Sequence, residues 1–531
     1  MTADRDVAPL VILALDVGDA EAIQEWAREG YLPTIASLME RGCWGRTSGP
    51  DLICEHGIWV SLLSGVSRGR HGYYASRQLR PGTYDLVRTT ELEADALPFW
   101  AHLRGRDVKV AIVDVPDAYP LPGLAGIQLA NWAVHNPSRG PSAEPTTVLR
   151  DVRRALGPAM RIDERIGSSV REDERIYRRL LERIERKGAL SRHLLGQRRF
   201  ELVVVGFAES HLASHQFWQY RPRADRPGPM AEGALTHAIR DVYRAIDQLL
   251  GRLLALLSPD ANVFLVASTG MADHYPTTGL IEAFCHRLGY QASPRSGRPS
   301  PGGPASNPLA AIRRTVPEAW RLALSRHFPR AIRERLLADQ FRGATDWRRT
   351  TAFAIPSLYS SFLRVNLRGR EPEGTVEAGP AYEALLDRLE SDLRRLVDPE
   401  TGQPAVQQIG RSARLFGDGP PQSLPDLFVT WKPAPYWMRR LAYPNAELTQ
   451  RKPEHLRGSD HTQHGFVAAA GPSVQRRGPI GEVSPLDLAP TFLRLLGEPL
   501  PLGMTGRPIE GLVGSAAMLT DNSTPGEKGV I

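Results

Sequence analysis

The sequence predicts an α/β fold with a mostly parallel central sheet sandwiched by helices. The first observation is a set of continuous apolar runs that end on a polar residue, such as residues 9–16 (PLVILALD). Runs of this kind are typical of parallel strands that are buried on both faces. The second observation is the strongly amphipathic segment 237–257, and the third is the alternation of helices with strands along most of the chain. This alternation favours a parallel sheet.

The elements can be assigned in chain order from these patterns. After the first strand, residues 20–42 predict helical structure interrupted by Gly30 and Pro33. Later apolar runs bounded by polar turns predict further strands, and amphipathic runs predict further helices. The expected strands are 108–115, 200–207, 261–267, two within 350–374, 423–433 and 464–472, and the expected helices are 58–65, 97–105, 237–257, Ala381 to Val397 and 484–497.

The length of 531 residues is too great for one simple core, so inserted segments are expected. We expect residues 1–515 to form one main domain. Residues 146–200 have Arg and Glu at three- and four-residue spacings, which predicts a solvent-facing helical cap. Residues 290–345 begin with a Ser-, Pro- and Gly-rich stretch and predict a linker with a helical insertion. The polar tail 516–531 is expected to be disordered.

The composition indicates which kinds of molecule the protein is expected to bind. The net charge of +7 comes mostly from scattered arginines, which favours anionic small molecules, and no basic run interleaved with aromatic residues indicates nucleic acid. The cysteines, Cys43, Cys54 and Cys285, have no zinc or redox spacing, so no disulfide framework is expected. The apolar runs are too short to cross a bilayer, and the N-terminal residues have no apolar leader pattern. We therefore expect a cytoplasmic protein without a membrane partner, and the sequence does not indicate its oligomeric state.

Polar residues follow the ends of several predicted strands, at Asp16, 210–215, 268–274 and 460–464. Because the carboxyl ends of parallel strands meet at one edge of a sheet, these residues are expected to share a cleft there. The side chains expected to converge in it are Asp16, Glu55, His211, His215, Ser268 and His461.

Several longer passages recur in one order along the chain. They are VILALDV with GYLPTIASLMERG, WVSLLSGVSRGRHGYY, LPFWAHLRGRDVKVAIVDVPDAYP, DWRRTTAFAIPSLYSSFLRVNLRGREPEGTV, SLPDLFV and DLAPTFLRLLGEPLPLGMTGRPI. Together they resemble the alkaline phosphatase superfamily, and specifically its type I phosphodiesterase and nucleotide pyrophosphatase branch. The resemblance implies an alkaline phosphatase-like catalytic domain, although residues 146–195 and 290–345 carry none of these passages.

In that branch two divalent metals act together: one polarises the phosphoryl oxygen, and the other activates a Thr or Ser nucleophile. The resemblance carries seven positions over to this chain. Three keep the family's residue type, namely Asp16, His215 and His461. Four differ: Glu55 stands at the nucleophile, His211 at an aspartate, and Ser268 and Thr269 at an adjacent Asp-His pair. A standard two-metal site with a hydroxyl nucleophile is therefore not expected.

The substitutions leave three histidines at the first metal site, His211, His215 and His461. His211 and His215 are four residues apart, so on a helix both rings lie on one face. Three neutral imidazoles with an open position suit zinc. We expect one divalent transition metal, most consistent with zinc, held by these histidines with Asp16 as a further ligand. The alternative is a vestigial site in which His211 is only a polar residue at a helix start.

Four residues are candidates for catalysis: Glu55, Asp16, Cys54 and His56. Glu55 is either a further metal ligand or a general base, and the alternative is a surface or capping carboxylate. Cys54 is a candidate nucleophile, and the alternative is a buried, inert thiol. His56 is an acid/base candidate. Asp460 and His464 are expected to orient the ring of His461, and Asp273 and His274 are expected to line the cleft.

Three functions follow from this pattern. The first is a metal-dependent hydrolase or group-transfer enzyme that acts on a small phosphate ester or other anionic ester, without the covalent intermediate of the family. The second is a pseudoenzyme that binds a ligand or partner. The third is non-phosphate chemistry at a three-histidine metal. Metal content separates the second from the other two, and hydrolysis of aryl phosphodiesters separates the first from the third.

Overall fold

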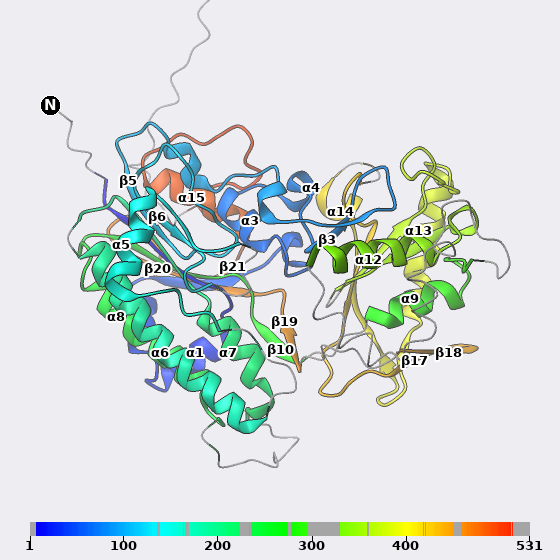
Figure 1. The fold of residues 1–531 in the computed structure, drawn as a ribbon, viewed down its shortest axis with the longest axis horizontal. Coiled ribbons are helices and arrows are strands. Elements are labelled where there is room, and N and C mark those ends of the chain that lie inside the picture. Colours follow the sequence, from blue (N-terminus) through cyan, green and yellow to red (C-terminus); the bar gives the residue numbers. More distant parts are fainter. Residues whose placement is uncertain are drawn as a thin grey trace, which may run out of the picture.

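The computed structural model describes residues 7–512, apart from 135–138, 163, 165–168, 197, 223–232, 234, 274–277, 295–329, 358–359, 418, 420, 451–457 and 511. Most of the expected linker and the whole of the expected disordered tail 516–531 lie outside the described residues. The described part forms a larger lobe built on a central sheet and a smaller lobe beside it (Figure 1).

The central sheet of the larger lobe has nine strands and is mostly parallel, as predicted. Strand β20 is antiparallel to both of its neighbours, and β7 is antiparallel to β6. The other pairs are parallel. In spatial order the strands are β21 (Gly478–Val483), β2 (Cys43–Thr47), β20 (Gly465–Ala470), β9 (Asn262–Ala267), β1 (Leu10–Leu15), β8 (Leu202–Phe207), β5 (Lys109–Val113), β6 (Ala125–Ala130) and β7 (Ser142–Glu144).

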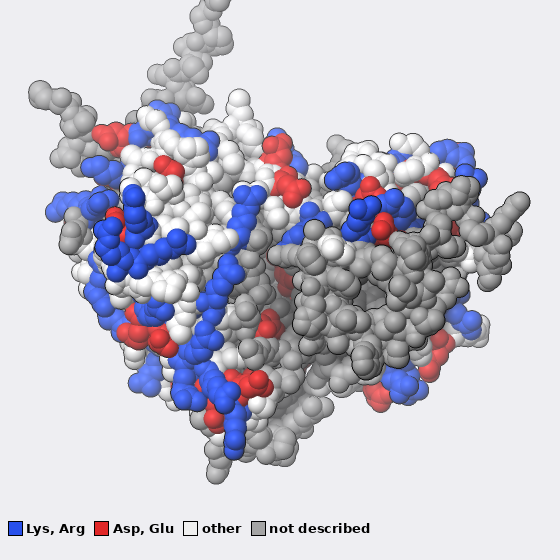
Figure 2. Space-filling view, in the orientation of Figure 1, with Lys and Arg blue, Asp and Glu red and all other residues white. Residues whose placement is uncertain are grey.

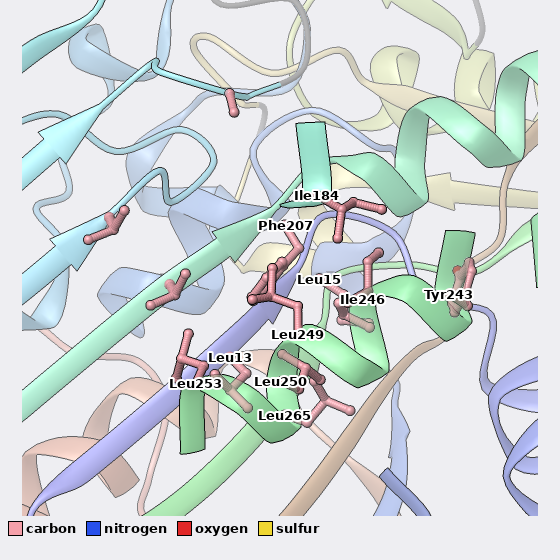
Figure 3. Packing of buried hydrophobic residues seen from close by; sticks show 14 of the residues in the cluster. Leu13, Leu15, Ile184, Phe207, Tyr243, Ile246, Leu249, Leu250, Leu253 and Leu265 are labelled. Atoms are coloured by element: carbon pink, nitrogen blue, oxygen red, sulfur yellow. The ribbon is translucent and has the colours of Figure 1, made fainter. Parts of the chain in front are cut away.

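Helices cover both faces of this sheet, which explains why every residue of β1 is buried. One face, with Leu13 and Leu15, packs against α1 (Ala20–Arg28), α2 (Pro33–Arg41), α5 (Thr146–Leu156), α6 (Val170–Leu195), α7 (Glu209–Phe217) and α8 (Ala238–Leu254). Figure 3 shows Leu249 and Leu253 of α8 over that face. The opposite face, with Leu10 and Ile12, packs against α3 (Ile58–Ser64), η3 (Phe99–Leu103) and α15 (Leu488–Leu495).

The smaller lobe is built on an antiparallel sheet with its own core. Its strands, in spatial order, are β11 (Ala352–Ile355), β12 (Ser361–Val365), β16 (Leu427–Trp431) and β15 (Val406–Arg411). A second sheet contains β14 (Gln403–Pro404), β13 (Val397–Asp398), β17 (Arg440–Tyr443) and β18 (Ala446–Thr449), and the helices are α9 (Thr278–Arg287), α12 (Arg330–Gly343) and α13 (Pro380–Arg394).

Short elements connect and flank the lobes. The two-stranded ribbon of β10 (Met271–Asp273) and β19 (Ser459–His461) lies between the two lobes (Figure 1). The others are α4 (Arg68–His71), α14 (Ser412–Phe416), β3 (Arg77–Leu79), β4 (Leu86–Arg88), η1 (Pro50–Leu52), η2 (Glu91–Glu93), η4 (Trp218–Tyr220), η6 (Trp347–Arg349) and η7 (Pro485–Asp487).

One predicted helix boundary differs from the structure. The helix expected to reach Val397 ends at Arg394, and Val397 begins β13, where it pairs with Pro404 and Ala442. The branched side chain of valine favours a strand over a helix end, so the tertiary pairing decides this position. The expected break in the helical segment 20–42 is confirmed, because Gly30 has a φ of +83° and Pro33 is the first residue of α2.

Residues 146–200 carry 15 basic and 8 acidic side chains, a net charge of +7 that equals the net charge of the whole chain. Figure 2 shows Lys and Arg gathered over α5 and α6. The exposed arginines there are Arg150, Arg153, Arg154, Arg161, Arg171, Arg175, Arg178, Arg179, Arg192, Arg198 and Arg199. The expectation of a solvent-facing cap is wrong for the inner side of α6, because Asp173, Arg183 and Lys187 are fully buried.

Among the helices that the structure describes, none is long and apolar enough to cross a membrane.

Candidate functional site

The strand ends of the central sheet bring the predicted site residues together. Asp16 follows β1, the helix α7 with His211 and His215 follows β8, and Ser268 follows β9. His461 ends β19, which pairs with β10 just beyond β9. The contacts that join these residues are His211 with Asp16, Ser268 with Asp16, His215 with His461, and His461 with Glu55.

Three imidazole rings lie at the centre of the site. One nitrogen from each of His211, His215 and His461 lies within 4.8 Å of the others. The ring centroids are 4.8 to 5.1 Å apart, and the two Nε2 atoms of His215 and His461 are 3.3 Å apart. His211 and His215 reach this position because α7 places them one turn apart, as expected from their spacing.

Each ring contacts a different oxygen through its Nδ1 atom. His211 Nδ1 is 2.8 Å from Asp16 Oδ2, His215 Nδ1 is 3.2 Å from Ser459 Oγ, and His461 Nδ1 is 3.0 Å from Thr269 Oγ1. Such contacts fix the orientation of an imidazole and leave Nε2 as the atom through which it can hold a metal. The arrangement is therefore that of three oriented imidazoles.

Asp16 is the carboxylate on the Nδ1 side of this cluster. Its Oδ1 accepts a hydrogen bond of 2.9 Å from Trp59 Nε1, while Oδ2 contacts His211. Burial alone would raise the pKa of Asp16, but the charge and hydrogen bond of His211 outweigh it, so the pKa lies below its ordinary value. Two groups of described residues have side-chain atoms close enough together to hold one metal ion. Asp16 belongs to neither group, although it was expected as a ligand from the sequence.

Glu55 lies on the opposite side of the cluster, against Nε2. Its Oε2 is 2.9 Å from His461 Nε2, and its Oε1 is 3.2 Å from Nδ1 of His56. Burial would raise the pKa of Glu55, but the charges and hydrogen bonds of His461 and His56 lower it well below its ordinary value. With 17% of its side chain exposed, Glu55 is not a surface carboxylate. It also forms a second possible metal-binding group with Asp460 and His461.

A fully buried arginine, Arg68, stabilises the loop that contains Glu55. The guanidinium of Arg68 donates to the carbonyl oxygens of Asp51, Cys54, His56 and Tyr73. The loop ends at Gly57, which has a φ of +83°. A Cβ atom at Gly57 would come within 2.3 Å of the carbonyl oxygen of Tyr73, so the turn requires glycine.

The thiol of Cys54 is buried next to this loop, and its Sγ donates to the carbonyl oxygen of Tyr74 over 3.4 Å. Burial raises the pKa of Cys54 to about 11. The geometry thus favours the inert thiol over the nucleophile. We expect native protein at pH 8 to react with less than about 0.1 thiol per chain in a standard aromatic disulfide assay, because only a small fraction of Cys54 is thiolate. Fast labelling of Cys54, identified by peptide mass analysis, would contradict this expectation, and denatured protein is the control.

A cleft of about 240 Å³ opens from the site toward the smaller lobe. Its described lining includes Cys54, Glu55, Thr269, Asp273, Thr430, Trp431, Asp460, His461 and His464. Asp273 lines the cleft as expected and accepts a hydrogen bond from Trp218 Nε1, whereas His274 lies outside the described residues. Asp460 accepts the backbone N–H of His461, and Thr269 Oγ1 contacts the ring of His461 at Nδ1.

The described lining of the cleft is acidic. Glu55, Asp273 and Asp460 are carboxylates, and among the described lining residues none is Arg or Lys. Three carboxylates in one lining favour a bound cation.

Several supporting residues were missed in the sequence. Trp59 and Ser459 were given no role from the sequence, and Thr269 was predicted only as a replacement within the family's Asp-His pair. Thr269 and Ser459 contact a histidine of the cluster through their hydroxyl groups, and Trp59 donates to Asp16. Thr269 lies two residues after the end of β9, and Ser459 begins β19 two residues before His461. A short hydroxyl side chain near a strand end that carries site residues is the signal that could have identified them.

A family model for type I phosphodiesterase / nucleotide pyrophosphatase matches residues 10–291, which is more than half of the chain. The match contains Asp16, Glu55, His211, His215 and Ser268, whereas His461 lies beyond it. A comparison with curated proteins finds no match.

Proposed function

Because the chain belongs to the type I phosphodiesterase / nucleotide pyrophosphatase family, we propose that it is a hydrolase or group-transfer enzyme for a small phosphate ester or similar anionic ester, with one metal in place of two. The observation that carries this proposal is the set of three Nδ1–oxygen contacts, which direct the three imidazoles of His211, His215 and His461 to a common point. Imidazoles oriented in this way suit a transition metal, and zinc is the first candidate.

The residues present fit a metal. The Nε2 atoms of His215 and His461 are 3.3 Å apart, and two ligands at 2.0–2.1 Å from one tetrahedral zinc are separated by about 3.3 Å. The carboxylates of the cleft lining support the same proposal, because they favour a bound cation. A bound metal would offset the substrate's negative charge, polarise its phosphoryl oxygen and favour deprotonation of the attacking water.

The residues of the family's second site have a different role in this proposal. Asp16 orients His211, and Thr269 orients His461, so two positions that carry metal ligands in the family support the remaining site. Ser268 donates to the backbone oxygen of Asp16 and holds that strand end. This accounts for the loss of the Asp-His pair without loss of an ordered site.

Glu55 is the proposed general base. Its Oε2 faces the Nε2 side of the cluster, where a phosphoryl group would lie. A carboxylate is ionised at neutral pH and can accept a proton from water. The water oxygen then attacks phosphorus, the ester P–O bond breaks, and the leaving alkoxide takes a proton from solvent water. His56, whose Nδ1 contacts Glu55 Oε1 and whose side chain is 32% exposed, can pass the proton to solvent. This route needs no hydroxyl nucleophile.

The experiment that tests the proposal combines metal analysis with an assay. Protein purified without chelator should contain about one transition metal per chain, and it should hydrolyse bis(4-nitrophenyl) phosphate. Absence of metal after incubation with zinc, manganese and iron salts would favour the pseudoenzyme. One bound metal without phosphodiester hydrolysis would favour non-phosphate chemistry at the three histidines.

A further inference from the structure

Helix α6 contacts the histidine-bearing helix α7 at both of its ends. At the C-terminal end of α7, the carboxylate of Asp173 accepts hydrogen bonds of 2.6 Å from Gln216 Nε2 and from the hydroxyl of Tyr220. Asp173 is fully buried, so these contacts are shielded from water.

The N-terminal end of α7 is held by charged contacts. Glu209, its first residue, has Arg183 Nε at 2.8 Å and Lys187 Nζ at 3.6 Å. The ammonium of Lys187 also donates to the carbonyl oxygen of Gly206 over 2.7 Å and lies 3.7 Å from Asp114. These four charged side chains are fully buried.

These two sets of contacts lie at opposite ends of α7, and His211 and His215 lie between them in the sequence. We infer that α6 acts as a positioning helix for this pair, with Asp173, Arg183 and Lys187 as the positioning residues. The inference rests on the proposed metal site and assigns a role to a segment that looks like a charged cap in the sequence.

Physical reasoning supports a role beyond packing. A helix of nine residues is marginal on its own, so the position of α7 depends on its tertiary contacts. Removing four charges from water is costly, and replacing such groups with apolar residues is often neutral or stabilising. Buried charges at this place are consistent with a demand for position, since a binding site tolerates errors of only about 0.5 Å.

The test measures cobalt(II) binding to the full-length protein and to three variants. Asp173→Asn keeps the shape of the side chain but places an amide donor against a group that donates to Asp173, such as Gln216 Nε2 or the Tyr220 hydroxyl. Tyr220→Phe removes one of these hydrogen bonds and is the milder variant. Tyr177→Phe is the matched control, because it removes a hydrogen bond from α6 to Asp241 of α8 while keeping the ring that packs on Phe217.

We expect Asp173→Asn to weaken cobalt binding by about 10-fold or more, measured by competition with a chelator, and to change the intensity of the cobalt d–d absorption. Tyr220→Phe should shift both readouts in the same direction by less, and Tyr177→Phe should shift neither. Melting temperatures of the metal-free proteins distinguish a variant that is destabilised as a whole from one in which only the position of His211 and His215 has changed.

Equal cobalt affinity and spectra in wild type, Asp173→Asn and Tyr220→Phe would overturn the inference and leave the proposed function standing, even if the melting temperatures fell. If wild-type protein bound no cobalt, the proposed function and this inference would both be overturned.

Discussion

Replacement of His215 by alanine is expected to remove the bound metal completely. His215 is buried, its Nε2 is 3.3 Å from that of His461, and its loss leaves two imidazoles at a position where three converge. Two histidines do not make a catalytic zinc site, which has three protein ligands. Elemental analysis of the variant should therefore give no transition metal above background, and phosphodiester hydrolysis should fall to the uncatalysed rate.

The matched control is His464→Ala. His464 lines the same cleft but is exposed and belongs to neither cluster with ligand spacing in the described part of the chain. It should keep both the metal and the activity. Retention of one metal per chain in His215→Ala would show that the metal is held elsewhere, and the single-site proposal would fail.

Replacement of Glu55 by glutamine is expected to lower kcat by about 10²–10⁴-fold with little change in metal content. The amide keeps the shape of the side chain but cannot accept the proton that the carboxylate accepts. The three imidazoles and their Nδ1 partners are unchanged, so about one metal per chain should remain. The two measurements together distinguish a base from a ligand, because loss of the metal in Glu55→Gln would assign Glu55 to the metal shell.

A second substitution at the same position tests the departure from the family. Glu55→Thr restores the family's hydroxyl, but Ser268 and Thr269 still cannot hold the metal that would activate it. We expect no phosphoryl-enzyme to be trapped and no activity above that of Glu55→Gln. Strong phosphodiesterase activity in Glu55→Thr would mean that a second metal binds near residue 55 after all.

Much of the fold could be predicted because each central strand is an apolar run that can be recognised from its own residues. Residues 10–15 and 202–207 are apolar throughout, as expected for strands covered on both faces, and both lie at the centre of the sheet. The convergence of Asp16, His211 and His461 then followed from the position of each at a strand end. What the sequence could not indicate is which ring nitrogen faces which neighbour, because this depends on side-chain orientation.

The buried charged side chains of α6 are a second feature that could not be predicted from the sequence. Arg and Glu occur on all sides of this helix, so its inner stripe does not look apolar, although Ile176, Leu180 and Ile184 are buried in it. Arg183 and Lys187 are on that stripe because acidic partners from distant segments meet them there. A pattern within one helix carries no information about such partners, so a solvent-facing surface was the natural prediction.

The position of β20 in the sheet has a consequence for synthesis of the chain on the ribosome. This strand, residues 465–470, inserts between β2 and β9, which are made hundreds of residues earlier. Until it emerges, both early strands have an edge without its final partner, and such edges promote association with other chains. His461 emerges just before β20, so the last imidazole of the three-histidine cluster and this strand arrive together. A nascent chain that stalls before residue 460 should therefore depend on chaperones and have no assembled centre.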